Sequence, residues 1–245
     1  MITLYGMSSP NVHKILIMLT ELNVDYAFRF VDVWKGEQFS KELSELNPIQ
    51  KMPIIIDDHD GQSEISTIFE SGAILIYLGE KYSMFLPKEG RERYQTIQWL
   101  MVQMSSVGPS FGQFNHFRRY VETPNEYAEA RFEAQTRNLY RQINDRLGKA
   151  RYLAGDVYSI ADISMFPWFR TMSMFFDGPS ELCRAYNAEY PNIWRWYDEV
   201  LSRTGVADAV AFIKSMKSTA ASATNEDRDR FFQRGNFSGR PIPTQ

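Results

Sequence analysis

The sequence predicts two parts of different fold class, a small α/β unit with a mixed sheet followed by an all-helical unit. Residues 1–82 alternate between strand-like and helical periodicity, whereas residues 91–217 contain long helical stretches and no convincing strand. Between them, residues 83–90 contain Pro87 and Gly90 and are typical of a linker. The length of 245 residues also fits two small domains, because one domain usually has ~100–200 residues.

The first part has the expected element order β-α-β-α-β-β-α. A short strand around Ile2 and Leu4 is followed by apolar residues at helical spacing from Val12 to Leu22. Aromatic and β-branched residues over 26–33 fit a second strand. The remaining elements are a short helix at 39–46, strands at 52–57 and 64–69 around the turn-rich DDHDGQ, and a helix at 71–82.

The second part is expected to hold helices around 91–106 and 125–148. Another helix start is marked at Ser159, which can cap the first turn while Asp162 reaches back in a capping box. Residues 218–245 open with small residues and then turn charged, so we expect an extended tail that is loose or lies on the surface.

Charge and composition argue against several function classes. The sequence has 27 Lys and Arg against 30 Asp and Glu, without the basic excess expected of a nucleic-acid-binding protein. No apolar run approaches the ~20 residues of a membrane helix, and the first residues show no export signal. The single cysteine, Cys183, cannot form an intramolecular disulfide or a CxxC pair, so we expect a reducing, cytoplasmic setting.

Metal and nucleotide motifs are missing from the sequence. The three histidines, His13, His59 and His116, do not have metal-ligand spacing, so we expect no metal. The sequence also lacks GxGxxG, P-loop and GxSxG motifs. A metal hydrolase, a nucleotide enzyme and a serine hydrolase are therefore poorly supported.

Three short segments of the first part indicate a small-molecule site instead. The first is SPN at 9–11, although a serine and a proline also form an ordinary helix cap. The second is KMP at 51–53, where a cis Pro53 would turn the Met52 backbone toward a ligand. The third is ES at 70–71, which suits a helix start but can also hold a carboxylate and an ammonium.

At this spacing within one unit, the segments resemble the thioredoxin-like domain of a glutathione S-transferase, followed by that family's helical domain. The resemblance is closer still to the Nu class, which includes bacterial glutathione-dependent disulfide reductases and a related fungal nitrogen regulator. It covers roughly residues 1–205. The segments that carry it are SPNVHK (9–14), KGEQF (35–39), NPIQKMP (47–53), FESGAILIYLGEK (69–81), QWL (98–100), GP-x-x-GQ (108–113), HF (116–117) and YSIADI-x-x-x-PW (158–168).

The resemblance implies glutathione as co-substrate and a thiolate site at Ser9 and Asn11. The Ser9 hydroxyl would donate to the glutathione sulfur, and Asn11 would contact the same atom. Tyr5 and Ser8 remain alternatives for the hydroxyl, because several transferase classes use a tyrosine near the end of the first strand. Since no cysteine stands at this position, any disulfide reduction must run between bound glutathione and the substrate.

The resemblance also implies a glutathione-binding set. The Met52 backbone would bond the cysteinyl backbone beside a cis Pro53, and Glu70 and Ser71 would hold the γ-glutamyl ammonium and carboxylate. The other implied members are Gln38 at the glycyl end, Lys51 as a cationic contact, and Arg131 reaching across a homodimer.

The function predicted in this way is glutathione-dependent thiol–disulfide reduction, since the Nu class binds two glutathiones or glutathione disulfide. One alternative is the conjugation of glutathione to an aromatic electrophile, or ether cleavage of one. Another is a non-enzymatic regulatory protein that binds glutathione or another ligand. Aromatic residues at 111–117 and 168–176 could wall a second-substrate pocket, although helix-bundle core suits most of them better. Cys183 is interpreted as structural.

Overall fold

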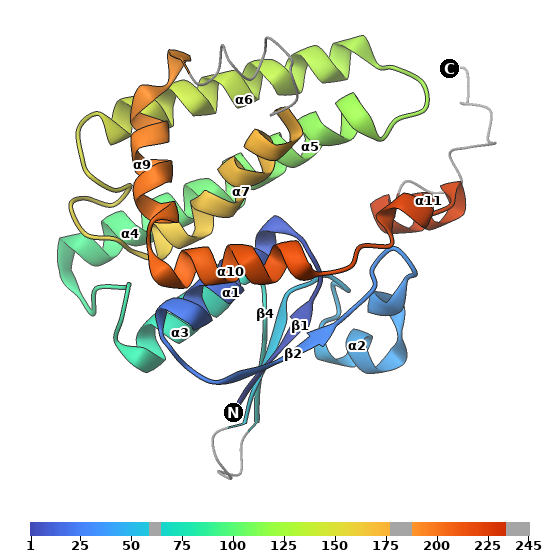
Figure 1. Cartoon of the computed structure of the whole chain (residues 1–245), viewed down its shortest axis with the longest axis horizontal. Coiled ribbons are helices and arrows are strands. Elements are labelled where there is room, and N and C mark those ends of the chain that lie inside the picture. Colours follow the sequence, from blue (N-terminus) through green and yellow to red (C-terminus); the bar gives the residue numbers. More distant parts are fainter. Residues whose placement is uncertain (59–64, 177–187, 234–245) are drawn as a thin grey trace.

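A computed structural model of the chain confirms the predicted fold class, a mixed sheet with helices joined to a helical part (Figure 1). The structure describes residues 1–58, 65–176 and 188–233. His59, Glu64 and Cys183 lie outside these residues, so the interpretations made for them are not addressed by the structure.

The sheet has four strands in the order β2-β1-β3-β4. β1 pairs in parallel with β2, with Leu4 opposite Phe28, and antiparallel with β3, with Leu4 opposite Ile55. β3 pairs antiparallel with β4. The elements of this part are β1 (Ile2–Gly6), α1 (Pro10–Glu21), β2 (Tyr26–Phe30), η1 (Glu37–Phe39), α2 (Lys41–Leu46), β3 (Ile54–Asp58), β4 (Ile65–Phe69) and α3 (Ser71–Tyr82).

Two strands are shorter than predicted. β2 ends at Phe30 rather than residue 33, because the Asp32 carboxylate accepts the Trp34 and Lys35 backbone N–H groups and turns the chain. β3 begins at Ile54 rather than residue 52, because Pro53 has no N–H to donate to a neighbouring strand.

The helical part contains the expected long helices. The segment predicted at 91–106 continues through a π-helical turn into the next helix, and the segment predicted at 125–148 forms α6. The elements are α4 (Gly90–Val102), η2 (Gln103–Val107), α5 (Gly108–Arg119), α6 (Glu126–Leu147), α7 (Ile160–Phe176), α9 (Pro191–Leu201) and α10 (Thr204–Ser215).

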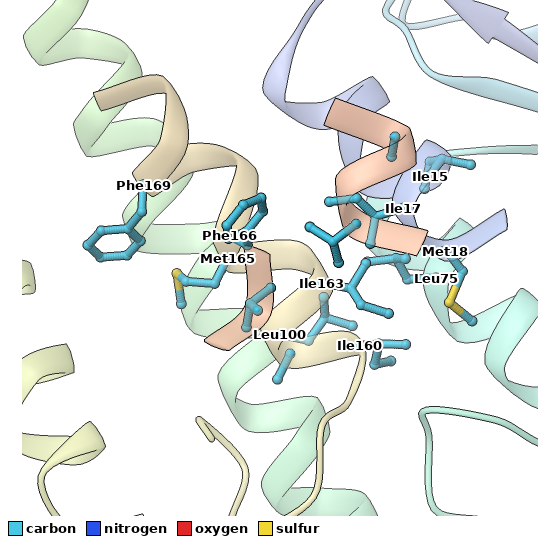
Figure 2. Close-up of a cluster of buried hydrophobic side chains, with 14 of the residues drawn as sticks. Ile15, Ile17, Met18, Leu75, Leu100, Ile160, Ile163, Met165, Phe166 and Phe169 are labelled. Atoms are coloured by element: carbon cyan, nitrogen blue, oxygen red, sulfur yellow. The ribbon is translucent and has the colours of Figure 1, made fainter. Parts of the chain in front are cut away.

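Helix α1 lies between the sheet and the helical part and is buried along its length. Eight consecutive residues, 12–19, are buried, and α1 packs on α3, α7 and α10. Figure 2 shows Ile17, Leu75 and Ile163 in the cluster where α1, α3 and α7 meet. Each fully buried Ile or Leu side chain stabilises the fold by roughly 1.5–3 kcal/mol, so this helix joins the two parts firmly.

Polar contacts tie the far end of α1 to α10. The Arg203 guanidinium donates to both carboxylate oxygens of Glu21, to Oε1 at 3.1 Å and to Oε2 at 2.6 Å, and lies 3.9 Å from the centre of the Tyr158 ring. The Thr20 hydroxyl donates to the Gly205 carbonyl at 2.7 Å. A paired, partly buried arginine of this kind fixes the angle between helices better than an exposed ion pair does.

At the start of α7 one of the two hydrogen bonds of the predicted capping box is present, the one from the Ser159 N–H to the Asp162 carboxylate. The Asp162 carboxylate is fully buried and accepts hydrogen bonds from the Ser159 and Leu153 backbones and the Trp196 indole. The Ser159 hydroxyl accepts from the Ala161 N–H rather than from that of Asp162. Tyr158 and Ile163, the expected staple, are both buried in the main hydrophobic cluster.

The expectation of an extended tail from residue 218 is wrong for residues 225–232. They form helix α11 (Asn225–Phe232), which begins with a capping box between Thr224 and Asp227. Phe231 lies 4.2 Å from Trp34 between ring centroids, and Phe232 lies 4.6 Å from His116. So short a helix is marginal alone and depends on these contacts, which link distant parts of the sequence.

No helix in the described part of the chain is long and apolar enough to cross a membrane.

The buried cap of α7 generates a stability prediction. Asp162→Ala leaves the backbone donors of Leu153 and Ser159 and the indole donor of Trp196 without an acceptor, so we expect a loss of about 3–5 kcal/mol. Asp208→Ala, at an exposed position of α10, is the matched control and should change stability by less than about 0.5 kcal/mol. Urea unfolding of both variants provides the measurement, and a loss below about 1 kcal/mol for Asp162→Ala would contradict this account.

Candidate glutathione site

A pocket of about 280 Å³ lies where α1, the loop before β3, the start of α3 and the helical part meet. Six of the predicted site residues line it: Asn11, Lys51, Met52, Pro53, Glu70 and Ser71. The fold therefore brings together three segments that are separated by up to 60 residues in the sequence.

The start of α1 presents Asn11 to the pocket. Ser9 is the N-cap, with its hydroxyl oxygen accepting from the Val12 N–H at 3.3 Å, and Pro10 occupies the first turn. The side-chain amide oxygen of Asn11 accepts a hydrogen bond from the Trp168 indole N–H of α7 at 3.2 Å. Because this contact uses the acceptor end of the amide, the NH₂ end of Asn11 remains to donate toward the pocket.

The loop before β3 is braced by Asn47. Its side-chain amide donates to the Lys51 carbonyl at 2.7 Å and its oxygen accepts from the Ile49 N–H at 2.9 Å. The Met52–Pro53 peptide bond is cis, as the resemblance implied. The buried Pro53 thus leaves the half-buried Met52 at the pocket wall.

The start of α3 has no side-chain cap. Glu70 has a left-handed φ of 66° and is exposed, and its side chain makes no capping hydrogen bond. Ser71 is only 3% exposed and lines the pocket. Without a side-chain cap from Glu70, the first N–H groups of α3 remain for a ligand carboxylate, which the helix dipole also favours.

Lys14, one turn into α1, forms the buried floor of this pocket. Its ammonium donates to the Ser71 hydroxyl at 3.1 Å and to the Gln103 side-chain oxygen at 2.5 Å. Burial lowers the pKa of Lys14 from 10.5 to about 7, while the negative charge of Glu70 opposes the shift. A titratable group near neutral pH therefore lies directly beneath Ser71.

Three predicted residues do not line the pocket. Ser9 lies beside it in sequence and acts as the helix cap. Gln38, in η1, is 4% exposed, and its side-chain oxygen has no hydrogen-bond partner among the described residues. Arg131 is exposed on α6. Of the alternatives to Ser9, Tyr5 packs against the cluster around Trp34, and Ser8 is exposed.

The aromatic residues proposed to wall a second pocket divide into two groups. Phe111, Phe114 and Phe169 are fully buried core residues. Trp168 lines the pocket, and Phe117 stacks on Phe132 with ring centroids 5.6 Å apart. The structure does not describe the side chains of residues 174–176.

Sequence reasoning missed several residues of the pocket. Lys14 stands immediately before the apolar run 15–19, in a helix whose residues 12–19 are all buried. A charged residue beside such an apolar run was the sequence signal that could have marked Lys14 as a functional residue. Asn47 lies within the NPIQKMP segment without an assigned role. Gln103 and Met104 come from the helical part and reach the site only through tertiary packing, as does Trp168, which was expected only as part of a second-substrate wall.

A metal centre is not supported in the described residues, where no group of three or more His, Cys, Asp or Glu could hold an ion. His13 is buried beside Phe166, and burial lowers its pKa to about 3, so its imidazole stays neutral. A larger cavity of about 900 Å³ lies between residues 83–87 and 151–159, but none of the predicted site residues line it.

Comparison with known proteins decides the family. The chain matches the glutathione S-transferase N-terminal domain over residues 1–80 and the C-terminal domain over residues 126–199. It is 39% identical over 212 residues to the disulfide-bond oxidoreductase YfcG of Escherichia coli K12, covering 86% of this chain and 94% of that protein. The chain belongs to the glutathione S-transferase family.

Solved structures of this family have the same fold. A family member from Pseudomonas fluorescens with two glutathione bound is 34% identical, with a TM-score of 0.79 over 85% of this chain and 92% of that one. A transferase from Pseudomonas putida with one glutathione disulfide bound per subunit is 31% identical, with a TM-score of 0.79 over 85% and 90%.

The lowered pKa of Lys14 generates a prediction on stability. Since its pKa is about 7 in the folded chain and near 10.5 when unfolded, the unfolded state binds more protons between these values, and stability gains from this group as pH rises. The gain is at most about 1.4 kcal/mol per pH unit. We expect Lys14→Met to remove it, whereas Lys214→Met, at an exposed position of α10, leaves it unchanged. Urea unfolding between pH 7 and 9 measures this dependence, and equal slopes in wild type and Lys14→Met would contradict it.

Proposed function

We propose that this protein is a glutathione-dependent thiol–disulfide reductase of the Nu class of glutathione transferases. The observation that carries the proposal is the convergence of Asn11, Met52, Glu70 and Ser71 on one pocket. The 39% identity to a disulfide-bond oxidoreductase and the glutathione disulfide held by a similar structure support the same chemistry.

The pocket offers separate partners for the γ-glutamyl and cysteinyl parts of glutathione. Ser71 and the open N–H groups of α3 would hold the γ-glutamyl carboxylate, and the Glu70 carboxylate would hold the neighbouring ammonium. The Met52 backbone would pair with the cysteinyl backbone. Gln38, the expected partner of the glycyl end, is buried and does not line this pocket, so the proposal gives it no direct contact.

The sulfur would then lie at the start of α1. The Asn11 NH₂ group is directed away from Trp168, and the Ser9 hydroxyl, which accepts from Val12, still has its proton to donate. Both donors and the positive end of the helix dipole stabilise a thiolate over a thiol.

The reaction requires two glutathiones for each disulfide. The bound thiolate attacks one sulfur of the substrate disulfide, forms a mixed disulfide and expels the other sulfur as a thiolate, which takes up a proton. A second glutathione thiolate attacks the glutathione sulfur of that mixed disulfide and releases the second substrate thiol. The two electrons come from the two glutathiones, which leave as glutathione disulfide, so the protein needs no cysteine of its own.

Thiolate formation alone does not account for the rate. A free thiol with a pKa of about 8.5 is roughly 3% ionised at pH 7, and lowering the pKa by about 2 units raises that fraction about 25-fold. Nucleophilicity falls by about 6–10-fold over the same range, so the net gain is only a few-fold. Holding the sulfur in line with the disulfide must supply the larger part.

Turnover tests the proposed function directly. We expect the purified chain to reduce hydroxyethyl disulfide with glutathione, followed through glutathione reductase and NADPH consumption, well above the uncatalysed rate. Tight glutathione binding with no turnover of any disulfide would instead favour a binding protein. Turnover only with aromatic electrophiles would favour conjugation or ether cleavage.

Two variants test the assignment of the hydroxyl. Ser9→Ala removes a donor to the thiolate, and we expect the pKa of bound glutathione to rise by about one unit, which corresponds to one hydrogen bond to a charged group. Tyr5→Phe should leave that pKa unchanged, because Tyr5 packs against the Trp34 cluster, whereas Ser9 caps the helix whose first turn carries the pocket-lining Asn11. Thiolate absorbance against pH measures both values, and the opposite pattern would reassign the role to Tyr5.

A homodimer in the cytoplasm completes the proposal. Arg131 is exposed and lies outside its own chain's pocket, so contact with glutathione requires a second copy. The cytoplasm supplies reduced glutathione and suits a chain with a single cysteine. Light scattering after size exclusion should give the mass of two chains, and a monomer would remove the role of Arg131.

A further inference from the structure

The ammonium of Lys14 is a buried cation that forms no ion pair with any residue that the structure describes. It is fully buried, and its partners among the described residues are neutral: Ser71, Gln103 and the Met104 sulfur at 3.5 Å. A buried charge without an opposing charge costs several kcal/mol. If Lys14 served only to hold the helices together, an apolar side chain of the same length would stabilise the fold more.

The surroundings of the ammonium lead to the pocket. Lys14 and all three of its partners line the pocket. Because the Ser71 oxygen accepts from Lys14, the Ser71 hydroxyl can donate its proton to another group. In this structure it donates to the Met104 sulfur, with 3.7 Å between oxygen and sulfur. Sulfur is a weak acceptor, so a ligand carboxylate above Ser71 would replace it readily.

We propose that Lys14 is the positioning cation of this pocket, and that its counter-ion is the γ-glutamyl carboxylate of the ligand, bound through the Ser71 hydroxyl. The inference rests on the proposed function, since it takes glutathione as the ligand. It adds a residue that orients Ser71 and that couples ligand binding to uptake of a proton.

Other charges around α1 do not neutralise Lys14. His13 on the same helix is neutral at physiological pH. The charge of Glu70 acts on Lys14, but the two form no ion pair, and the exposed Glu70 side chain is available for the ligand ammonium. Arg170 on α7 and Lys51 at the pocket rim add only positive charge. The other charged side chains of α1 and of the helices packed against it are either hydrogen-bonded or exposed. The hydrogen-bonded ones are Glu21 with Arg203, Lys81 (and Tyr77) with Asp57, Glu80 with Arg93, and Asp162 with Trp196. Asp208 and Lys214 on α10 are exposed.

A carboxylate bound over Ser71 would favour the charged form of Lys14. The Lys14 pKa of about 7 would rise on binding, so the complex would hold more protons than the separate partners above pH 7. Binding would therefore take up about one proton at pH 8. The affinity would fall as pH rises, by up to about tenfold per pH unit.

Isothermal titration calorimetry of the full chain with S-methylglutathione tests this coupling. The thioether has no titrating thiol, and titrations at pH 8 in buffers of different ionisation enthalpy give the number of protons taken up. We expect at least half a proton more for wild type than for Lys14→Met, and an affinity that falls more steeply with pH in wild type than in Lys14→Met. Lys214→Met is the matched control and should behave as wild type. Uptake by the ligand's own ammonium remains in every variant and cancels in the comparison.

Equal proton uptake in wild type and Lys14→Met, with binding retained, would overturn the role of Lys14 and leave the proposed function standing. Absence of binding heat at every pH would overturn both. If Lys14→Met does not fold, the same titration of the wild-type protein with a second ligand tests the proposal. In this ligand the γ-glutamyl carboxylate is replaced by hydrogen. That ligand should take up at least half a proton less than S-methylglutathione, and equal uptake would contradict the proposal.

Discussion

The burial of helix α1 on all sides is the constraint on which the rest of the structure depends. Residues 12–19 are buried between the sheet and the helical part, and the far end of the helix is held by the Glu21–Arg203 pair. The first turn is therefore fixed relative to both parts. Asn11, which bonds to Trp168 of α7, and Lys14, which bonds to Gln103, both depend on that placement.

The pocket is a consequence of this arrangement rather than of any one motif. The sheet places the cis Pro53 loop and the start of α3 next to each other, since Ile54 pairs with Phe69 at the ends of β3 and β4. The helical part closes the third side with Gln103 and Trp168. The proposed binding groups thus come from the starts of two helices and from a loop braced by Asn47, which would limit the entropy lost when a peptide ligand is held.

Much of this could be predicted from the sequence where local chemistry decides. The order of elements, the Ser9 cap and the Glu70–Ser71 helix start follow from patterns within a few residues, whereas the cis Pro53 was implied by the family resemblance. Helix α11 could not be predicted in this way, although TNED at 224–227 has the polar ends of a capping box, because an eight-residue helix depends on Trp34 and on His116. The same holds for the pocket residues from the helical part, which packing rather than periodicity brings to the site.

The central claim is that this pocket holds glutathione with its γ-glutamyl end on Ser71 and its sulfur at the start of α1. A crystal structure of the protein with glutathione disulfide tests it most directly. The account predicts a γ-glutamyl carboxylate within hydrogen-bond distance of the Ser71 N–H and hydroxyl, and a sulfur beside Asn11. A ligand seated instead in the larger cavity between residues 83–87 and 151–159, or one with its γ-glutamyl end turned away from α3, would contradict it.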